Sequence, residues 1–124
     1  MHTTLLLLGK TDFSPLRRDR VGTLQVNLGC RCNQSCLHCH VGAKRIRTGE
    51  MGGATADMVV EVLRMRSLKT LGLTGRAPQL HARFRCLVRV ARALGVTVID
   101  RCNSTILSKP GEKDLAQFLA VEFA

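Results

Sequence analysis

The feature that most constrains this chain is a run of three cysteines, spaced C-x3-C-x2-C, in the stretch from Cys32 to His40. Three thiols so close in sequence can meet at one centre only where the backbone wraps around it, and thiolates select zinc, copper or iron–sulfur over hard cations. Structural zinc usually has four protein ligands, often as two separated C-x2-C pairs, and no second pair follows here. The spacing therefore favours an iron–sulfur cluster held by three thiolates, with one iron left open.

Hydrophobic patterns on either side of this loop predict an α/β chain. Strands are expected at 24–28, where Leu24, Val26 and Leu28 alternate with polar residues, and at 69–74 and 96–99. Helices are expected at 56–66, with Thr55 as N-cap, at 81–94 and at 114–123. Strands that alternate with helices at this spacing favour parallel βαβ units.

The helix at 81–94 has the clearest pattern, because its apolar residues repeat at three and four positions. Arg85, Arg89 and Arg92 fall on its other side and are expected to form a solvated face rather than a binding patch. Cys86 is expected to point inward and pack. The apolar stripe expected on the helix at 56–66 is Met58, Val59, Val62 and Leu63.

In parallel α/β folds, ligands gather at the carboxyl ends of the strands. Three stretches follow the expected strands: the cysteine run, residues 74–79, and residues 100–103 with Cys102. We expect them to line one side of the molecule together.

The length and charge of the chain bear on its number of domains, its binding partners and its location. A chain of 124 residues has room for one domain, expected at 23–124 behind a poorly defined leader at 1–22. The 19 Lys and Arg against 9 Asp and Glu give a formal charge of +10, but with four Phe and no Trp or Tyr we do not expect nucleic-acid binding. The leucine run 5–8 is too short for a signal peptide or a membrane span, so a cytoplasmic protein with reduced thiols is expected.

Residues 24–41, with Cys32, Cys36 and Cys39, resemble the cluster loop of radical S-adenosylmethionine (SAM) enzymes. More narrowly, the chain is similar to the arsenosugar-biosynthesis radical SAM family. The stretches that carry this resemblance are 24–29, 32–36, 38–41, 73–75 with 77–78, and 98–103. Together they cover about residues 23 to 120.

The resemblance implies that Cys32, Cys36 and Cys39 bind a [4Fe-4S] cluster, whose fourth iron takes the amino and carboxylate groups of SAM. It also implies that the reduced cluster cleaves SAM to a 5′-deoxyadenosyl radical, and that the deoxyadenosyl group goes to a methylated arsenic compound. An electron donor and a small-molecule substrate are the implied partners. The residues implied to contact SAM are Gly75, Ala77, Pro78 and Gln79.

The resemblance further implies a partial TIM-type barrel of about six βα units, of which this chain supplies three. We therefore expect the N-terminal half of such a barrel and suspect a fragment. The family motif Gly-Gly-Ala-Pro-Glu reads Gly75-Arg76-Ala77-Pro78-Gln79 here. Arg76 replaces a glycine that permits close backbone approach, and Gln79 lacks the charge that strengthens a carboxylate–ammonium bond, so weaker SAM binding is expected.

Other interpretations of the same residues stay open. Cys32, Cys36, Cys39 and His40 could form a structural zinc site, and 36–40 also fits the C-x-x-C-H signature of c-type haem. The chain could also be an inactive truncated relative, or a non-enzymatic zinc-binding or basic module. Cys30 is expected to be a buried inert thiol.

Overall fold

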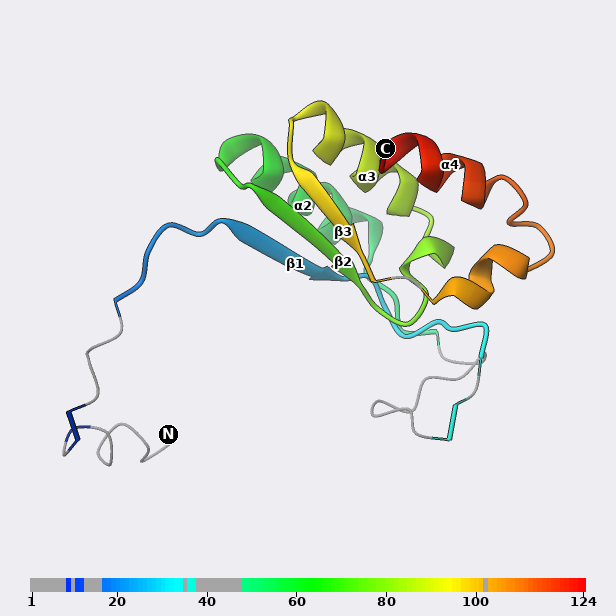
Figure 1. Cartoon of the computed structure of the whole chain (residues 1–124), viewed down its shortest axis with the longest axis horizontal. Coiled ribbons are helices and arrows are strands. Elements are labelled where there is room, and N and C mark those ends of the chain that lie inside the picture. The colour runs from blue at the N-terminus through cyan, green and yellow to red at the C-terminus, as the bar shows by residue number, and fades with distance from the viewer. Residues whose placement is uncertain (1–8, 10, 13–16, 35, 38–47, 102) are drawn as a thin grey trace.

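A computed structural model describes residues 9, 11–12, 17–34, 36–37, 48–101 and 103–124. The chain forms β1 (Thr23–Asn27), α2 (Gly53–Met65), β2 (Thr70–Thr74), α3 (Phe84–Ala93), β3 (Thr97–Asp100) and α4 (Leu115–Glu122). Two short 3-10 helices, η1 (Pro78–Leu80) and η2 (Ser104–Ser108), follow β2 and β3. Figure 1 shows the helices stacked against one side of the sheet.

The sheet has three parallel strands in the order β1-β2-β3. Thr23 pairs with Thr70 and Asn27 with Thr74, while Leu73 of β2 pairs with Asp100 of β3. Each strand is joined to the next through a helix, so the predicted parallel βαβ units are confirmed. All three strands end at the same edge of the sheet, and the loops after them meet there (Figure 1).

The core lies between the sheet and its helices. Period-two alternation places Leu71 and Leu73, which have no exposed surface, on the side that faces Phe84 and Leu87 of α3. The opposite side of the sheet carries exposed residues: Thr23, Gln25, Asn27, Thr97 and Ile99. One face is therefore packed and the other is polar and uncovered by the described residues.

The start of α2 differs from its prediction. The helix begins at Gly53, and its N-cap is Gly52, so no side chain caps its first turn. The predicted N-cap, Thr55, is therefore wrong, because it lies inside the helix. Met51 N donates to Leu28 O at 3.0 Å, and this tertiary bond fixes where the chain leaves the sheet edge and turns into the helix. Met58, predicted to pack, is 60% exposed.

The start and orientation of α3 also differ. It begins at Phe84, because the turn that follows η1 occupies residues 81–83, the first three of the predicted range. Cys86 is exposed rather than packed. Two residues correspond to about 200° around a helix, so a side chain two positions after the fully buried Phe84 points away from the core. Leu94, also predicted to pack, is 45% exposed.

The arginines of α3 contact α4 rather than forming a bare solvated face. Arg85 donates to both carboxylate oxygens of Asp114, at 2.5 and 2.9 Å, and Arg89 pairs with Glu122 at 3.3 Å. Both guanidinium groups lie over the ring of Phe118, at 5.0 and 5.3 Å from its centroid. The hydrogen bond from Arg85 lowers the pKa of Asp114 below its usual value. These contacts join the last helix to the βαβ core.

The described part of the chain contains no helix that is both long and apolar enough to cross a bilayer.

Candidate functional site

The cysteine loop leaves and re-enters the fold through a pair of clamped segments at the end of β1. Gly29 and Glu50 form an antiparallel bridge, with Cys30 N donating to Gly49 O at 2.7 Å and Met51 N to Leu28 O at 3.0 Å. Arg31 and Glu50 add an ion pair at 3.0 Å. The chain between Cys30 and Gly49 is thus closed at its base, the arrangement that a ligand-wrapping loop requires.

Gly29 is the residue on which this base depends. Its φ of +143° lies in the region that favours glycine, and a Cβ built there would come within 2.6 Å of Gly49 O and 2.9 Å of Glu50 Cα. Both contacts are with backbone, so no side chain could turn away to make room. The close approach of the two chain segments therefore needs glycine at position 29.

The loop after β2 is hydrogen-bonded to the start of the cysteine loop. Arg76 N donates to Gly29 O at 3.3 Å and Ala77 N to Arg31 O at 3.1 Å. Gly75 has a φ of +136°, and a Cβ there would lie 3.0 Å from Gly29 O. The expectation that these two stretches lie together at the carboxyl edge of the sheet is confirmed.

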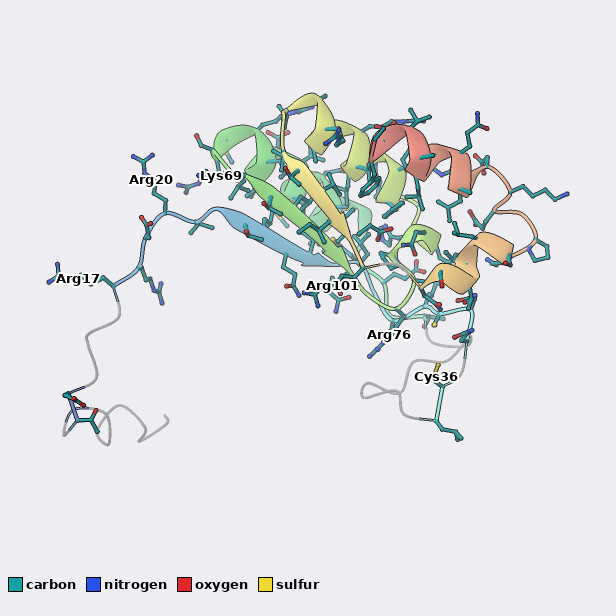
Figure 2. All side chains as sticks on the ribbon, viewed as in Figure 1. Arg17, Arg20, Cys36, Lys69, Arg76 and Arg101 are labelled. Atoms are coloured by element: carbon teal, nitrogen blue, oxygen red, sulfur yellow. The ribbon has the colours of Figure 1, made fainter. Side chains whose placement is uncertain are left out.

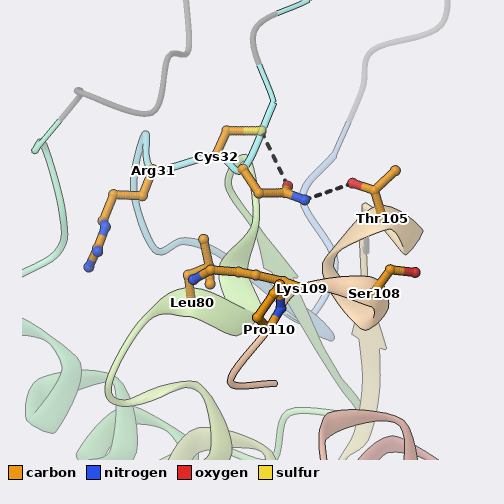
Figure 3. Close-up of a pocket in the computed structure, with 8 residues that line it drawn as sticks. Arg31, Cys32, Leu80, Thr105, Ser108, Lys109 and Pro110 are labelled. Atoms are coloured by element: carbon orange, nitrogen blue, oxygen red, sulfur yellow. Dashed lines mark hydrogen bonds between the residues drawn. The ribbon is translucent and has the colours of Figure 1, made fainter. Parts of the chain in front are cut away.

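The loop after β3 reaches the cysteine loop through side chains. Asn103 Nδ2 donates to Asn33 Oδ1 at 3.0 Å, and Asn33 Nδ2 donates to Thr105 Oγ1 at 2.8 Å, the bond drawn in Figure 3. Asn103 Nδ2 also lies 3.9 Å from Cys32 Sγ. Asn33 and Thr105 were not predicted as site residues, and they are 72 positions apart, so no local pattern could have identified their contact. Cys102 lies outside the described residues.

Two of the three predicted metal ligands can be located. Cys32 is half-buried, and its Sγ accepts a hydrogen bond from Gln34 N at 3.4 Å. Cys36 is exposed, and its Sγ lies 3.7 Å from Gln34 Oε1, further out on the loop (Figure 2). Cys39 lies outside the described residues, as do His38 and His40.

The described residues contain no cluster of three or more His, Cys, Asp or Glu side chains suited to a metal ion. Because the third cysteine and both neighbouring histidines are not described, the predicted three-thiolate set stays a prediction. Cys30, predicted to be a buried inert thiol, is half-buried and lies at the clamped base.

Two hollows flank the junction of the loops. A pocket of about 200 Å³ is lined by the ends of β1 and β2 and the residues after them: Asn27, Gly29, Cys30, Thr74, Gly75 and Arg76. A larger one, of about 420 Å³, lies between the cysteine loop and η2, with Arg31, Cys32, Asn33, Thr105 and Lys109 among its lining residues (Figure 3). Cys32 thus borders a space of ligand size.

The four residues implied to contact SAM differ in how accessible they are in the structure. Gly75 lines the smaller pocket, together with Arg76. Ala77, Pro78 and Gln79 are buried, and Gln79 is only 5% exposed. Their contact with SAM stays a prediction that would require this stretch to open.

Gln79 is bonded inward, to Asp100 at the end of β3. Its Nε2 donates to Asp100 Oδ2 at 2.5 Å. Burial raises the pKa of Asp100 above its usual value, and the bond from Gln79 opposes this in part. The pair fastens the loop after β2 to the end of β3.

The donor set and the backbone geometry fit the cofactors that the resemblance implies. Cys32 and Cys36 present thiols with solvent access on a loop closed at its base, and thiolates are the ligands that iron–sulfur clusters take. Gly75 opens onto a pocket beside that loop, and its φ of +136° together with a Cβ position 3.0 Å from Gly29 O disfavours a side chain there. Comparisons with models of protein families and with curated proteins find no match.

Proposed function

We propose that this chain is the N-terminal part of a radical SAM enzyme, in which Cys32, Cys36 and Cys39 hold a [4Fe-4S] cluster. The observation that carries the proposal is the clamped loop at the end of β1, which bears Cys32 and Cys36 and accepts hydrogen bonds from Arg76 N and Ala77 N. The two stretches that such chemistry needs, a thiolate loop and a glycine-containing loop, are thereby held side by side.

The sheet supports the same proposal. Parallel strands in sequential order, each joined to the next through a helix, are the arrangement found in the N-terminal half of a TIM-type barrel. The exposed Gln25 and Asn27 of β1 would then face the inside of the barrel. The thiolate loop lies at the carboxyl end of the strands, where such barrels place their active sites.

The chain's own residues would perform three tasks. The thiolates of Cys32, Cys36 and Cys39 would bind the cluster. When reduced, the cluster would supply the electron for SAM cleavage. Asn103, within 3.9 Å of Cys32 Sγ, donates toward that sulfur, and hydrogen bonds to ligating sulfur tune a cluster's reduction potential. Gly75 leaves space for backbone approach to SAM at the pocket that it lines.

We propose a methylated arsenic compound as substrate, together with an electron donor and a cytoplasmic location. The substrate and the electron donor rest on the motif resemblance alone, and the location rests on the leucine run 5–8, which is too short for a signal peptide.

Anaerobic reconstitution with iron and sulfide tests the enzyme proposal. We expect SAM to change the electron paramagnetic resonance spectrum of the reduced protein, and 5′-deoxyadenosine to accumulate with a reductant. A Cys36→Ala variant should abolish both, whereas Cys86→Ala, which removes an exposed thiol on α3, should abolish neither. A spectrum unchanged by SAM, with no 5′-deoxyadenosine, would refute the enzyme.

That refuting result would favour a second candidate, a cluster-binding relative that does not cleave SAM. The inward bond of Gln79 and the presence of Arg76 at the pocket are the observations that favour it. A chain with Arg76→Gly and Gln79→Glu distinguishes the causes. Recovery of SAM binding would assign the defect to these two side chains, and its absence would assign it to the rest of the fold.

A further inference from the structure

Two buried oxygens without a hydrogen-bond partner belong to two residues that are hydrogen-bonded to each other through other atoms. Within the described part of the chain, the buried side-chain atoms that lack any partner are Gln79 Oε1 and Asp100 Oδ1. The same two residues are joined through their other atoms, Nε2 and Oδ2, at 2.5 Å. Each residue therefore has one satisfied and one unsatisfied polar atom.

An unsatisfied buried oxygen is costly, because it has lost its hydrogen bonds to water and gained none. Two acceptors cannot satisfy one another unless one carries a proton. A carboxyl group can carry that proton and an amide oxygen can accept it, so one proton on Asp100 would satisfy both atoms.

The surroundings offer no other compensation for a charged Asp100. The titratable groups on the neighbouring segments are Arg76, His81, Arg83, Arg85, Arg89 and Arg101. Among the described residues none of them forms an ion pair with Asp100. Arg83 pairs with Asp57, Arg85 with Asp114, and Arg89 with Glu122.

His81 is likewise committed elsewhere. Its Nε2 lies 2.9 Å from Met51 O, and its Nδ1 accepts from Arg83 N at 3.1 Å. Burial without a counter-ion raises the pKa of Asp100, in agreement with the geometry.

We propose that Asp100 and Gln79 form a neutral acid–amide pair, closed by two hydrogen bonds, that acts as a proton-dependent latch between the loop after β2 and the end of β3. In the closed pair, Gln79 Nε2 donates to Asp100 Oδ2, and the carboxyl proton on Oδ1 is donated to Gln79 Oε1. Loss of that proton leaves one bond and a buried charge. The latch exists in the chain without any cofactor, so it stands independently of the proposed enzyme.

The latch gives a role to Gln79, the residue that stands where the family motif has glutamate. Glutamate at position 79 would put a second carboxyl group against Asp100, and two carboxyls at such a distance cannot both ionise. The glutamine makes the same pair with a single proton and no second charge. The position of the loop from Gly75 to Gln79 then depends on pH through Asp100 alone.

Carbon-13 NMR of the full chain tests the latch directly. The carboxyl resonance of Asp100, assigned by its disappearance in Asp100→Asn, should titrate above the value of about 3.9 for a free aspartate, because burial raises the pKa of that carboxyl. A midpoint for Asp100 at or below about 3.9 would overturn the proposal.

Unfolding as a function of pH gives a second, independent measurement. Because the folded pKa is raised, the latch contributes its full stability below the unfolded pKa of about 3.9 and loses it as the pH rises through the folded pKa. Over that window the wild-type unfolding constant should increase by up to about tenfold per pH unit more than that of Asp100→Asn. The asparagine keeps both bonds without a titrating proton, as its Nδ2 donates to Gln79 Oε1.

The control is Asp57→Asn, the same chemical change at a carboxylate that contacts neither Gln79 nor Asp100, and the loss of stability with rising pH described above should persist in it. Gln79→Glu should make the profile steeper, because a second carboxyl must then hold or lose a proton in the same place. Parallel profiles for the wild type and Asp100→Asn would overturn the latch.

Discussion

Gly29→Ala is the substitution that most sharply tests how the cysteine loop is held. An alanine there must adopt a φ of +143°, at a cost of about 1–3 kcal/mol, the range for side chains held in rarely populated backbone regions. Its Cβ would also lie 2.6 Å from Gly49 O, so the clamp must open and weaken the bond from Cys30 N to Gly49 O. That adds about 1 kcal/mol. We expect a total loss of about 3 kcal/mol.

Gly95→Ala is the matched control. Gly95 also has a positive φ, +73°, but a Cβ there meets nothing within 4 Å, so only the cost of about 1–2 kcal/mol for a side chain in the left-handed region applies. Urea denaturation of both variants gives the two free energies of unfolding. Equal losses, within about 0.5 kcal/mol, would show that the clamp makes no contribution beyond backbone strain and would refute the close-approach argument.

Two further substitutions test other contacts of the fold by urea denaturation. Phe118→Ala should cost about 3–4 kcal/mol, because its ring is buried against Phe84 and beneath two arginines, whereas Val121→Ala, 68% exposed on the same helix, should cost less than about 0.5. Equal costs would contradict the packing of α4. Asn33→Ala should cost about 1 kcal/mol through its lost bonds to Asn103 and Thr105, and an unchanged stability would show that these bonds are not formed in solution.

The strands and their parallel arrangement could be predicted because they follow from local pattern. Alternation at period two marks which residues of β1 enter the core, and the strand–helix–strand spacing leaves little choice but parallel pairing. The predicted boundaries of the strands are within a residue of those observed.

The starts of α2 and α3 and the side-chain partners could not be predicted, because contacts distant in sequence decide them, whereas α4 begins within a residue of its prediction. Gly53 opens α2 after a bond between Met51 and Leu28, and no side-chain cap marks the place. Gln79 and Asp100 are 21 positions apart, and the residues next to each of them give no sign of their hydrogen bond. The cysteine spacing identified the loop, while the clamp at Gly29 that closes it emerged only from the fold.

Metal analysis of the anaerobically reconstituted chain tests whether the three thiols of this loop hold an iron–sulfur cluster. We expect about four iron and four sulfide per chain in the wild type and in Cys86→Ala, with visible absorption of a [4Fe-4S] cluster. Single alanine substitutions of Cys32, Cys36 and Cys39 should each remove most of that iron. Stoichiometric zinc in place of iron, or iron that survives all three substitutions, would contradict the account.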